Sequence, residues 1–349
     1  MFPFRVLNQA AIQENLDMRS CLEIVERAYT LKDEQKATLF PMVFHEFEPG
    51  VADMDIKSGH LAGANIFGLK LVSWFGENPA KGLPAIIGTV MVLDSKTGAP
   101  IGIMSGEAIT LMRTGAAAGV GAKQFARADS KVLLSVGSGH LGPYHILATL
   151  MVLENIEKVL VYNPRSVERA TAFCTTIREK CLGLLAPYRS DQEFYDEMVR
   201  RIHVPFEVVQ DIALATAEAD VINTATPSKQ ALIKKEWVKA GTHITCLGAD
   251  MEGKQELDEH IYANAKVFVD DVTQAVNVGE TEIPIKKGTI QKDALIEIGS
   301  VIRGRKPSRT SDHDITVFDS TGIALQDLLT AESILKEAEK NGSGVVADI

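Results

Sequence analysis

Apolar residues in the middle of the chain occur in short runs, and the segments between them have the spacing of amphipathic helices. The runs have the length of buried strands and lie at 132–136, 159–162, 206–209, 221–226, 243–247 and 267–271. After the first run, helical spacing places Ile146, Leu147 and Leu150 on one face. Such alternation is typical of a doubly wound parallel sheet. We therefore predict an α/β protein with a Rossmann-type domain over 129–309, interrupted by a polar insertion at 186–203.

The flanking segments predict a second domain, of the α+β type, formed by residues 1–128 and completed by 310–349. Helices are expected at 18–37 and 110–125, with several strands between them. The tail is expected to add a strand at 315–318 and a final helix, both packed on this domain. The chain contains no internal repeat and no low-complexity tract.

The first strand–helix unit of the Rossmann-type segment carries a glycine motif. Gly137, Gly139 and Gly142 satisfy G-x-G-x-x-G directly after a predicted strand. The glycines permit a sharp turn, close approach of a pyrophosphate, and close approach of the helix to the strand. A glycine-rich turn that binds nothing is the alternative. Candidate cofactor-binding residues are those of the motif and of the turn after the strand at 221, namely Gly137, Ser138, Gly139, His140, Leu141, Gly142, Thr224, Ala225 and Thr226.

The end of the second strand bears on the choice of cofactor. NAD-selective sites usually place Asp or Glu there to bind the ribose 2′-hydroxyl, whereas NADP sites use a cation. Here Asn163 occupies the position, followed by Arg165 and Ser166. This pattern favours NADP over NAD, although Arg165 is equally compatible with a solvated residue at a helix start.

Two cations stand in apolar surroundings and indicate an anionic ligand. Strand alternation places Leu69 and Leu71 on one side and Lys70 on the other, inward side. Arg113 is expected near the start of its helix, where the helix dipole disfavours a cation. Lys70 and Arg113 would together hold a carboxylate, with Arg113 as the bidentate group. The alternative is an interdomain salt bridge.

Asp250 follows a predicted parallel strand at the edge where ligands bind, so it is a candidate acid/base, or alternatively a helix N-cap. The eight histidines have no metal-ligand spacing, and the four cysteines form no C-x-x-C pair. We therefore expect no metal site.

Composition narrows the class of protein. The chain has 349 residues, a net charge of −10 and 46% hydrophobic residues. This acidic balance argues against a nucleic-acid partner. The sequence has no signal-peptide pattern and no apolar stretch long enough to span a membrane. A cytoplasmic enzyme with reduced thiols is the expectation.

Several motifs, in order and over nearly the whole length, resemble the ornithine cyclodeaminase/μ-crystallin family, which includes archaeal-type alanine dehydrogenases and ketimine reductases. The segments that carry the resemblance are GLKLVS at 68–73, NPAKGLP at 78–84, LDSKTGAP at 93–100, LMRTGAA at 111–117, GAD at 248–250, GKQELD at 253–258 and DSTGIA at 319–324.

The resemblance implies a Rossmann domain joined to a domain whose strands build a homodimer. It implies that Lys70 and Arg113 bind the substrate α-carboxylate and that Asp250 is the acid/base of a cyclodeaminase. Ser320 would approach the nicotinamide, and Thr114, next to Arg113, is a further candidate in the cofactor site.

The sequence departs from the family pattern at two places. No arginine follows Pro41, where family members often carry one, and Lys57 is the candidate replacement. Ser105 stands where the family usually has Asp. Both changes concern the identity of the substrate.

Three functions are compatible with these residues. The first is conversion of a diamino acid such as L-ornithine to proline and ammonia, with Asp250 as the base and hydride returned by the same cofactor. The second is a net amino-acid dehydrogenase or cyclic ketimine reductase, which the NADP-like Asn163 and Arg165 favour. The third is a non-enzymatic nucleotide-binding protein, against which Lys70, Arg113 and Asp250 argue.

Overall fold

The computed structural model describes residues 2–349, which divide into two compact units. Unit 1 contains the chain up to Arg113 together with Ile323–Ile349, and unit 2 contains Thr114–Gly322. The boundary therefore lies within a helix, α3 (Gly106–Phe125).

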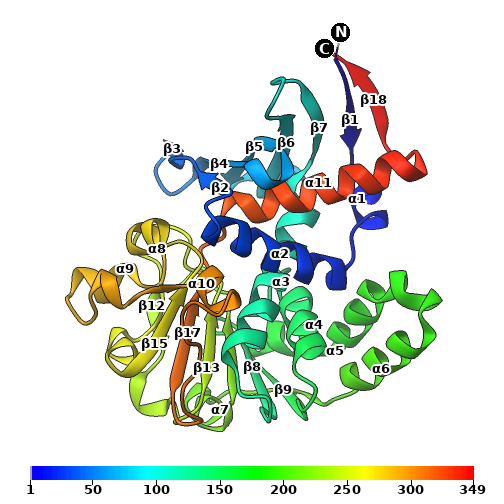
Figure 1. Cartoon of the computed structure of the whole chain (residues 1–349). Coiled ribbons are helices and arrows are strands. Elements are labelled where there is room, and N and C mark those ends of the chain that lie inside the picture. The colour runs from blue at the N-terminus through cyan, green and yellow to red at the C-terminus, as the bar shows by residue number, and fades with distance from the viewer. Residues whose placement is uncertain (1) are drawn as a thin grey trace. The chain divides into compact units, whose positions relative to one another are not determined.

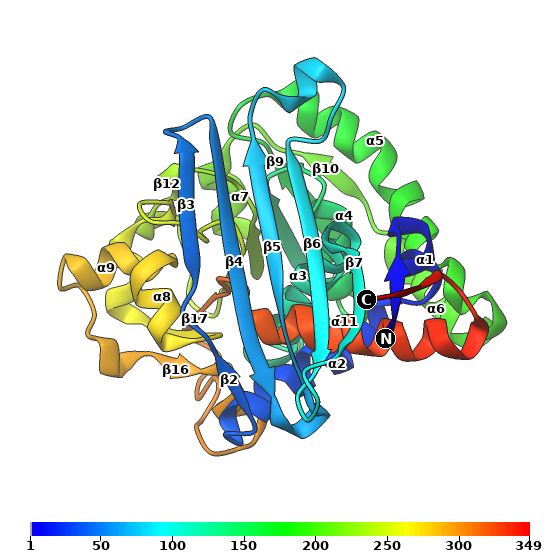
Figure 2. The same cartoon turned by 90° about the horizontal axis from the view of Figure 1, so that it is seen from above.

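Unit 1 is an antiparallel-rich sheet with helices against one face (Figure 2). Seven strands follow the order β18-β1-β7-β6-β5-β4-β2, and β3 pairs with β4. A Cβ on Gly68 of β5 would lie 2.8 Å from Leu328 of α11, so this helix lies very close to the sheet. The elements are β1 Pro3–Leu7, α1 Gln9–Glu14, α2 Met18–Asp33, β2 Ala37–Leu39, β3 Val43–Glu48, β4 Ala52–Leu61, β5 Ile66–Phe75, β6 Ile86–Asp94, β7 Pro100–Ser105, α11 Ala324–Asn341 and β18 Val345–Asp348.

Unit 2 is built on an eight-stranded parallel sheet in the order β10-β9-β8-β11-β13-β17-β15-β16 (Figure 1). The predicted α/β, doubly wound fold is confirmed. The chain winds one way from β8 and then the other way from β11, so the ligand-binding switch point lies between these strands. Its strands are β8 Val132–Val136, β9 Lys158–Tyr162, β10 Phe206–Val208, β11 Val221–Thr224, β13 His243–Cys246, β15 Ala265–Val269, β16 Ile296–Glu297 and β17 Ile315–Asp319, with a separate pair β12 Lys229–Ile233 and β14 Gln255–Leu257.

Helices cover this sheet, and its core is aliphatic and aromatic. The rings of Phe125 and Phe268 stack with centroids 3.8 Å apart, and Phe318 lies against Phe125. The helices are α4 Gly142–Val152, α5 Val167–Leu184, α6 Gln192–Ile202, α7 Ile212–Glu218, α8 Val272–Val278, α9 Glu282–Lys286 and α10 Ile298–Ile302.

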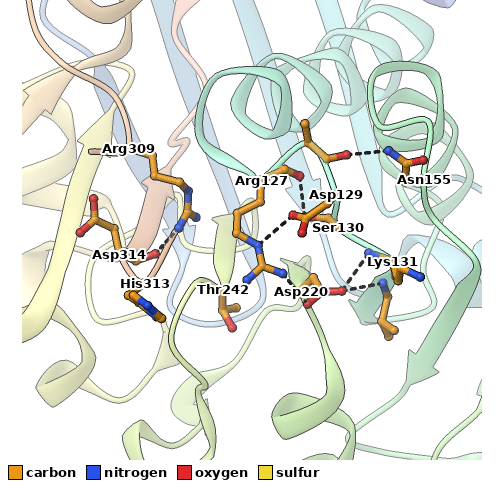
Figure 3. A network of polar contacts seen from close by, with 12 residues as sticks. Arg127, Asp129, Ser130, Lys131, Asn155, Asp220, Thr242, Arg309, His313 and Asp314 are labelled. Atoms are coloured by element: carbon orange, nitrogen blue, oxygen red, sulfur yellow. Dashed lines mark hydrogen bonds and ion pairs between the residues drawn. The ribbon is translucent and has the colours of Figure 1, made fainter. Parts of the chain in front are cut away.

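A polar network closes the amino-terminal edge of the same sheet (Figure 3). Asp220 accepts hydrogen bonds from the backbone N–H groups of Lys131 and Val132 at 2.8 and 3.1 Å. It also pairs with Arg127 at 3.3 Å and Lys239 at 2.8 Å. Because these groups satisfy one another, we assign the network a structural role, which is to stabilise this edge of the sheet.

Several local expectations need correction. The tail strand does not pack on the first domain: β17 lies between β13 and β15 of the parallel sheet. The helix expected at 18–37 ends at Asp33. The segment at 186–203, expected as a polar insertion, is mostly the helix α6. Helix α3 begins four residues earlier than expected, so Arg113 lies beyond its first turn and the argument from the helix dipole fails.

Candidate functional site

In unit 1, Lys70 and Arg113 share one buried carboxylate. Asp327 of α11 accepts from Lys70 Nζ at 2.9 Å and from Arg113 Nε at 3.0 Å, through the same oxygen, Oδ1. The three side chains are 2%, 6% and 0% exposed. Two cations against one anion leave a net positive charge in a region of low dielectric, which favours a second anion.

Lys57 adds a third cation to this cluster. It lies on β4 directly opposite Lys70 of β5, and it is buried. Like charges directly opposite each other on adjacent strands are destabilising. Its charge lowers the pKa values of both Lys70 and Asp327, so the positive potential extends over all of these groups.

Burial, and next the charge of Arg113, lower the pKa of Lys70 to about 8. Burial pushes the pKa of Asp327 up, but the charges of Arg113 and Lys70 outweigh burial and hold it below its ordinary value. The carboxylate therefore stays ionised at neutral pH, while Lys70 is close to its titration range.

In unit 2, the glycine turn has the geometry expected for a dinucleotide. Gly137 has φ of +110°, which favours glycine, and a Cβ there would lie 2.6 Å from the carbonyl oxygen of Ala225. A Cβ on Gly139 would meet no atom within 4 Å, so this side of the turn is open to an approaching phosphate. A Cβ on Gly142 would lie 2.5 Å from Phe173 of α5, so this glycine admits the next helix and not the strand.

The end of β9 carries no acidic side chain at the ribose position. Asn163 accepts from the backbone N–H groups of Arg165 and Ser166 at 2.9 and 3.2 Å. It donates to Ser138 Oγ at 2.7 Å. Asn163 therefore joins the glycine turn to the next loop.

A surface pocket of about 370 Å³ lies beside this loop. Its two charged lining residues are cations, Arg165 and Lys229, and both are exposed. Lys229 was not among the residues singled out from the sequence. The complete lining is Pro164, Arg165, Thr226, Pro227, Ser228, Lys229, Gln230, Ala231 and Leu232.

The hydroxyls of Thr224 and Thr226 are bound by another side chain of unit 2 and do not face a free site. Both donate to the carboxylate of Glu256 at 2.7 Å. Ala225 donates its backbone N–H to Val136 O at 2.9 Å, which ties the turn to β8. Any contact of these residues with a cofactor would therefore come largely from the backbone.

The remaining candidates lie in different environments. Asp250 is exposed in the loop after β13 and pairs with Lys254 at 2.6 Å; no helix follows, so it is not an N-cap. Ser320 is buried beyond β17, and its hydroxyl has no hydrogen-bond partner. Thr114 is buried in α3, and His140 and Leu141 lie in the glycine turn, His140 exposed.

Two important residues were missed from the sequence. Asp327 is an acid in a largely apolar stretch of sequence that includes Leu325, Leu328 and Leu329, and that setting was the available signal. Glu256 is a wholly buried acid in a short strand, and it was noted only as part of a motif.

One surface cluster has metal-ligand chemistry. Asp258, Glu259 and His260 bring ligand atoms within 4.8 Å of one another. His260 bonds to Asp258, and Lys287 pairs with Glu259 at 2.5 Å, so these groups satisfy one another. Across residues 2–349, no helix is both long and apolar enough to cross a membrane.

A glycine turn at the switch point of a parallel sheet is the arrangement expected of a dinucleotide-binding domain. The chain belongs to the ornithine cyclodeaminase/mu-crystallin family, whose model matches residues 4–193 and 186–342. It is an NAD(P)-dependent enzyme, either an amino- or imino-acid oxidoreductase or a cyclodeaminase.

Individual relatives cover almost the whole chain. Alanine dehydrogenase of Archaeoglobus fulgidus is 35% identical over 340 residues, which is 97% of this chain and 96% of that protein. The structure of an archaeal alanine dehydrogenase dimer with bound NAD matches with a TM-score of 0.84 and 32% identity, covering 99% of both chains. Thermococcus litoralis Δ1-pyrroline-2-carboxylate reductase, solved with NADH and L-proline, matches with a TM-score of 0.86 and 29% identity, covering 98% of this chain and 99% of that one.

The buried cluster of unit 1 predicts which of two substitutions destabilises the protein more. Asp327→Asn leaves Lys70 and Arg113 without a counter-charge and should lower the free energy of unfolding by about 3–5 kcal/mol. Lys70→Met keeps the Arg113–Asp327 pair and should cost clearly less. Urea unfolding followed by circular dichroism measures both. An equal or larger loss for Lys70→Met would contradict the assignment of Asp327 as the shared counter-ion.

Proposed function

We propose that the chain is an NAD(P)-dependent reductase of α-imino acids that also oxidises the corresponding amino acid in reverse. The observation that carries the proposal is the cation pair Lys70 and Arg113 sharing one oxygen of Asp327 at 2.9 and 3.0 Å. A buried pair with a net positive charge and a planar guanidinium suits a substrate carboxylate.

Each residue has a definite task in this proposal. Arg113, Lys70 and Lys57 bind the α-carboxylate and so fix the direction in which Cα faces, which is catalysis by positioning. A nicotinamide cofactor held at the glycine turn would supply the chemistry of hydride transfer to or from Cα. In reduction the imine nitrogen gains a proton, so the C=N bond becomes C–N and one reduced cofactor is consumed for each amino acid formed.

Cyclodeamination is the second candidate, and Asp250 favours it. That reaction needs a base to take a proton from the side-chain amine before the amine attacks Cα. Asp250 lies in the loop after a central parallel strand, where such a group is expected. Its ion pair with Lys254 and its half-exposed side chain support a reductase more than a dedicated base.

We also propose that NADP(H) is the preferred cofactor. The ribose position at the end of β9 is the neutral Asn163, and the pocket beside it brings Arg165 and Lys229 together. Two cations and no carboxylate suit a 2′-phosphate better than a 2′-hydroxyl. Two relatives were solved with NAD or NADH, so the proposed preference for NADP(H) differs from the cofactors bound in those structures.

The assembly that we propose is a homodimer formed through the sheet of unit 1. Large apolar side chains are exposed on β3 and around the adjoining ends of β5 and β6, and the exposed rings of Phe47 and Phe75 stack at 5.8 Å. An apolar patch of this kind is typical of an interface. The group comprises Phe40, Val43, Phe44, Phe47, Phe75, Leu83, Ile86 and Ile87.

The first prediction here concerns the reaction. Purified enzyme with Δ1-pyrroline-2-carboxylate or pyruvate plus ammonia should consume NADPH or NADH stoichiometrically, followed at 340 nm. L-ornithine with catalytic NAD+ should give no proline. Proline and ammonia from ornithine without net cofactor reduction would establish the cyclodeaminase instead.

The same assay tests the role of Arg113. Arg113→Lys should raise the KM for the imino acid at least tenfold, because a bidentate contact with its carboxylate is lost.

The two cations of the pocket beside β9 should determine the preference for NADPH over NADH. Arg165→Ala and Lys229→Ala should each weaken NADPH binding about tenfold, as expected for loss of one phosphate contact, while NADH binding stays within about twofold. Fluorescence titration measures all four affinities. Arg189→Ala, a change at another surface cation of unit 2, is the control. Equal loss for both cofactors would show that neither cation reads the 2′-phosphate.

The protein should be a dimer in solution, held together by the apolar patch of unit 1. Light scattering coupled to size exclusion should give twice the chain mass of 37.9 kDa. Phe47→Asp with Ile86→Asp should shift the protein to monomer, because each places a charge in the apolar patch. Val345→Asp, an exposed apolar residue on β18, is the matched control and should remain dimeric.

A further inference from the structure

Glu256 of β14 is completely buried, and its carboxylate accepts four hydrogen bonds. Oε1 accepts from the backbone N–H and the hydroxyl of Thr226, both at 2.7 Å. Oε2 accepts from the Thr224 hydroxyl at 2.7 Å and from the backbone N–H of Gly248 at 3.1 Å. The carboxylate thus uses all of its usual acceptor positions.

These donors belong to two different loops at the carboxyl edge of the parallel sheet. Thr224 and Thr226 end β11 and begin the loop that is a candidate for cofactor binding. Gly248 lies in the loop after β13, two residues before Asp250. A Cβ on Gly248 would lie 2.2 Å from the carbonyl oxygen of Thr226 and 2.6 Å from Glu256 Oε2, so the loops are in backbone contact. One side chain therefore joins both loops.

The strand that carries Glu256 is itself anchored. Glu280 accepts from the backbone N–H groups of Glu256 and Leu257 at 2.9 and 2.6 Å. Burial, and next the charge of Glu256, raise the pKa of Glu280 well above its ordinary range. Burial also raises the pKa of Glu256, to about 7, although the hydrogen bonds from Thr224, Thr226 and Gly248 act against burial. Of the two carboxyl groups, Glu256 is therefore the one that loses its proton first, and its hydrogen bonds to both loops favour the ionised form.

We propose that Glu256 is a positioning residue that holds the loop after β11 and the loop bearing Asp250 in one arrangement, so that cofactor affinity and turnover both depend on it. It cannot touch a ligand, because its side chain is buried, and it acts only through Thr224, Thr226 and Gly248. The inference rests on the proposed function, since turnover is defined by that reaction.

A matched control lies at the opposite edge of the same sheet. Asp220 is also buried and also accepts from two backbone N–H groups, at 2.8 and 3.1 Å, but it is bonded to the amino ends of the strands. Loss of either carboxylate leaves buried donors unpaired and should lower the melting temperature. Only loss of Glu256 should disturb the two loops.

The experiment compares Glu256→Gln, Glu256→Asp and Asp220→Asn with the wild type, well below their melting temperatures. Glu256→Gln turns an NH₂ group toward donors and should weaken NADPH and NADH binding about tenfold and lower kcat for imino-acid reduction by a similar factor. Glu256→Asp, which keeps the charge, should recover part of both. Asp220→Asn should change neither by more than about twofold.

Unchanged binding and turnover in Glu256→Gln, or an equal loss in Asp220→Asn, would overturn the proposal. If Glu256→Gln does not fold, Thr224→Val removes one donor and should show a smaller loss in the same direction; unchanged binding and turnover there would also overturn it. A wild type that binds NADPH but reduces no imino acid would instead refute the proposed function, and the binding comparison would still test the role of Glu256.

Discussion

The physical constraint on which unit 1 depends is a single carboxylate oxygen buried between two cations. Removing Lys70, Arg113 and Asp327 from water is costly, and the attraction within the triad offsets that cost only in part. Buried ion clusters of this kind can often be replaced by apolar side chains of similar volume without loss of stability. The arrangement is therefore best explained by the net positive charge of the triad, which is buried and so is poorly screened by water.

The secondary structure around this triad serves to hold it in place. Lys57 and Lys70 are opposed by the register of two long antiparallel strands, and Asp327 comes from a helix that lies close on the same sheet. Arg113 comes from α3, where unit 1 meets unit 2 in the sequence. Side chains on rigid strands and helices lose little entropy when an anion binds, which makes the cluster suited to orienting a small substrate.

In unit 2 the corresponding constraint is close backbone approach at the carboxyl edge of the parallel sheet. Gly137 approaches Ala225, and Gly248 approaches Thr226, at distances that a Cβ would prevent. Glu256 supplies an acceptor for each of the four donors around it. The edge is thus a rigid polar surface whose hydrogen bonds are largely satisfied by the protein itself.

Much of the architecture follows from local patterns. The runs of apolar residues correctly indicated six strands of unit 2, namely β8, β9, β10, β11, β13 and β15, because a strand buried on both faces needs a continuous apolar sequence. The short strands β12, β14 and β16 were not predicted. Alternation around Lys70 correctly placed it inward. Local patterns failed where the neighbours are distant in sequence. The strand at 315–319 has the same apolar character whichever sheet accepts it, and only its pairing with β13 and β15 decided its place.

The sequence by itself determined the fold class, the glycine turn and the inward direction of Lys70, because each depends on residue type and spacing within a short segment. The tertiary structure alone decided their partners. Asp327 is 257 residues from Lys70, and Lys229 reaches the pocket of Arg165 from another strand. Glu256 likewise meets Thr224 across 32 residues. Charge pairing and hydrogen bonding act through space, so no local pattern specifies which of many acids or bases completes a site.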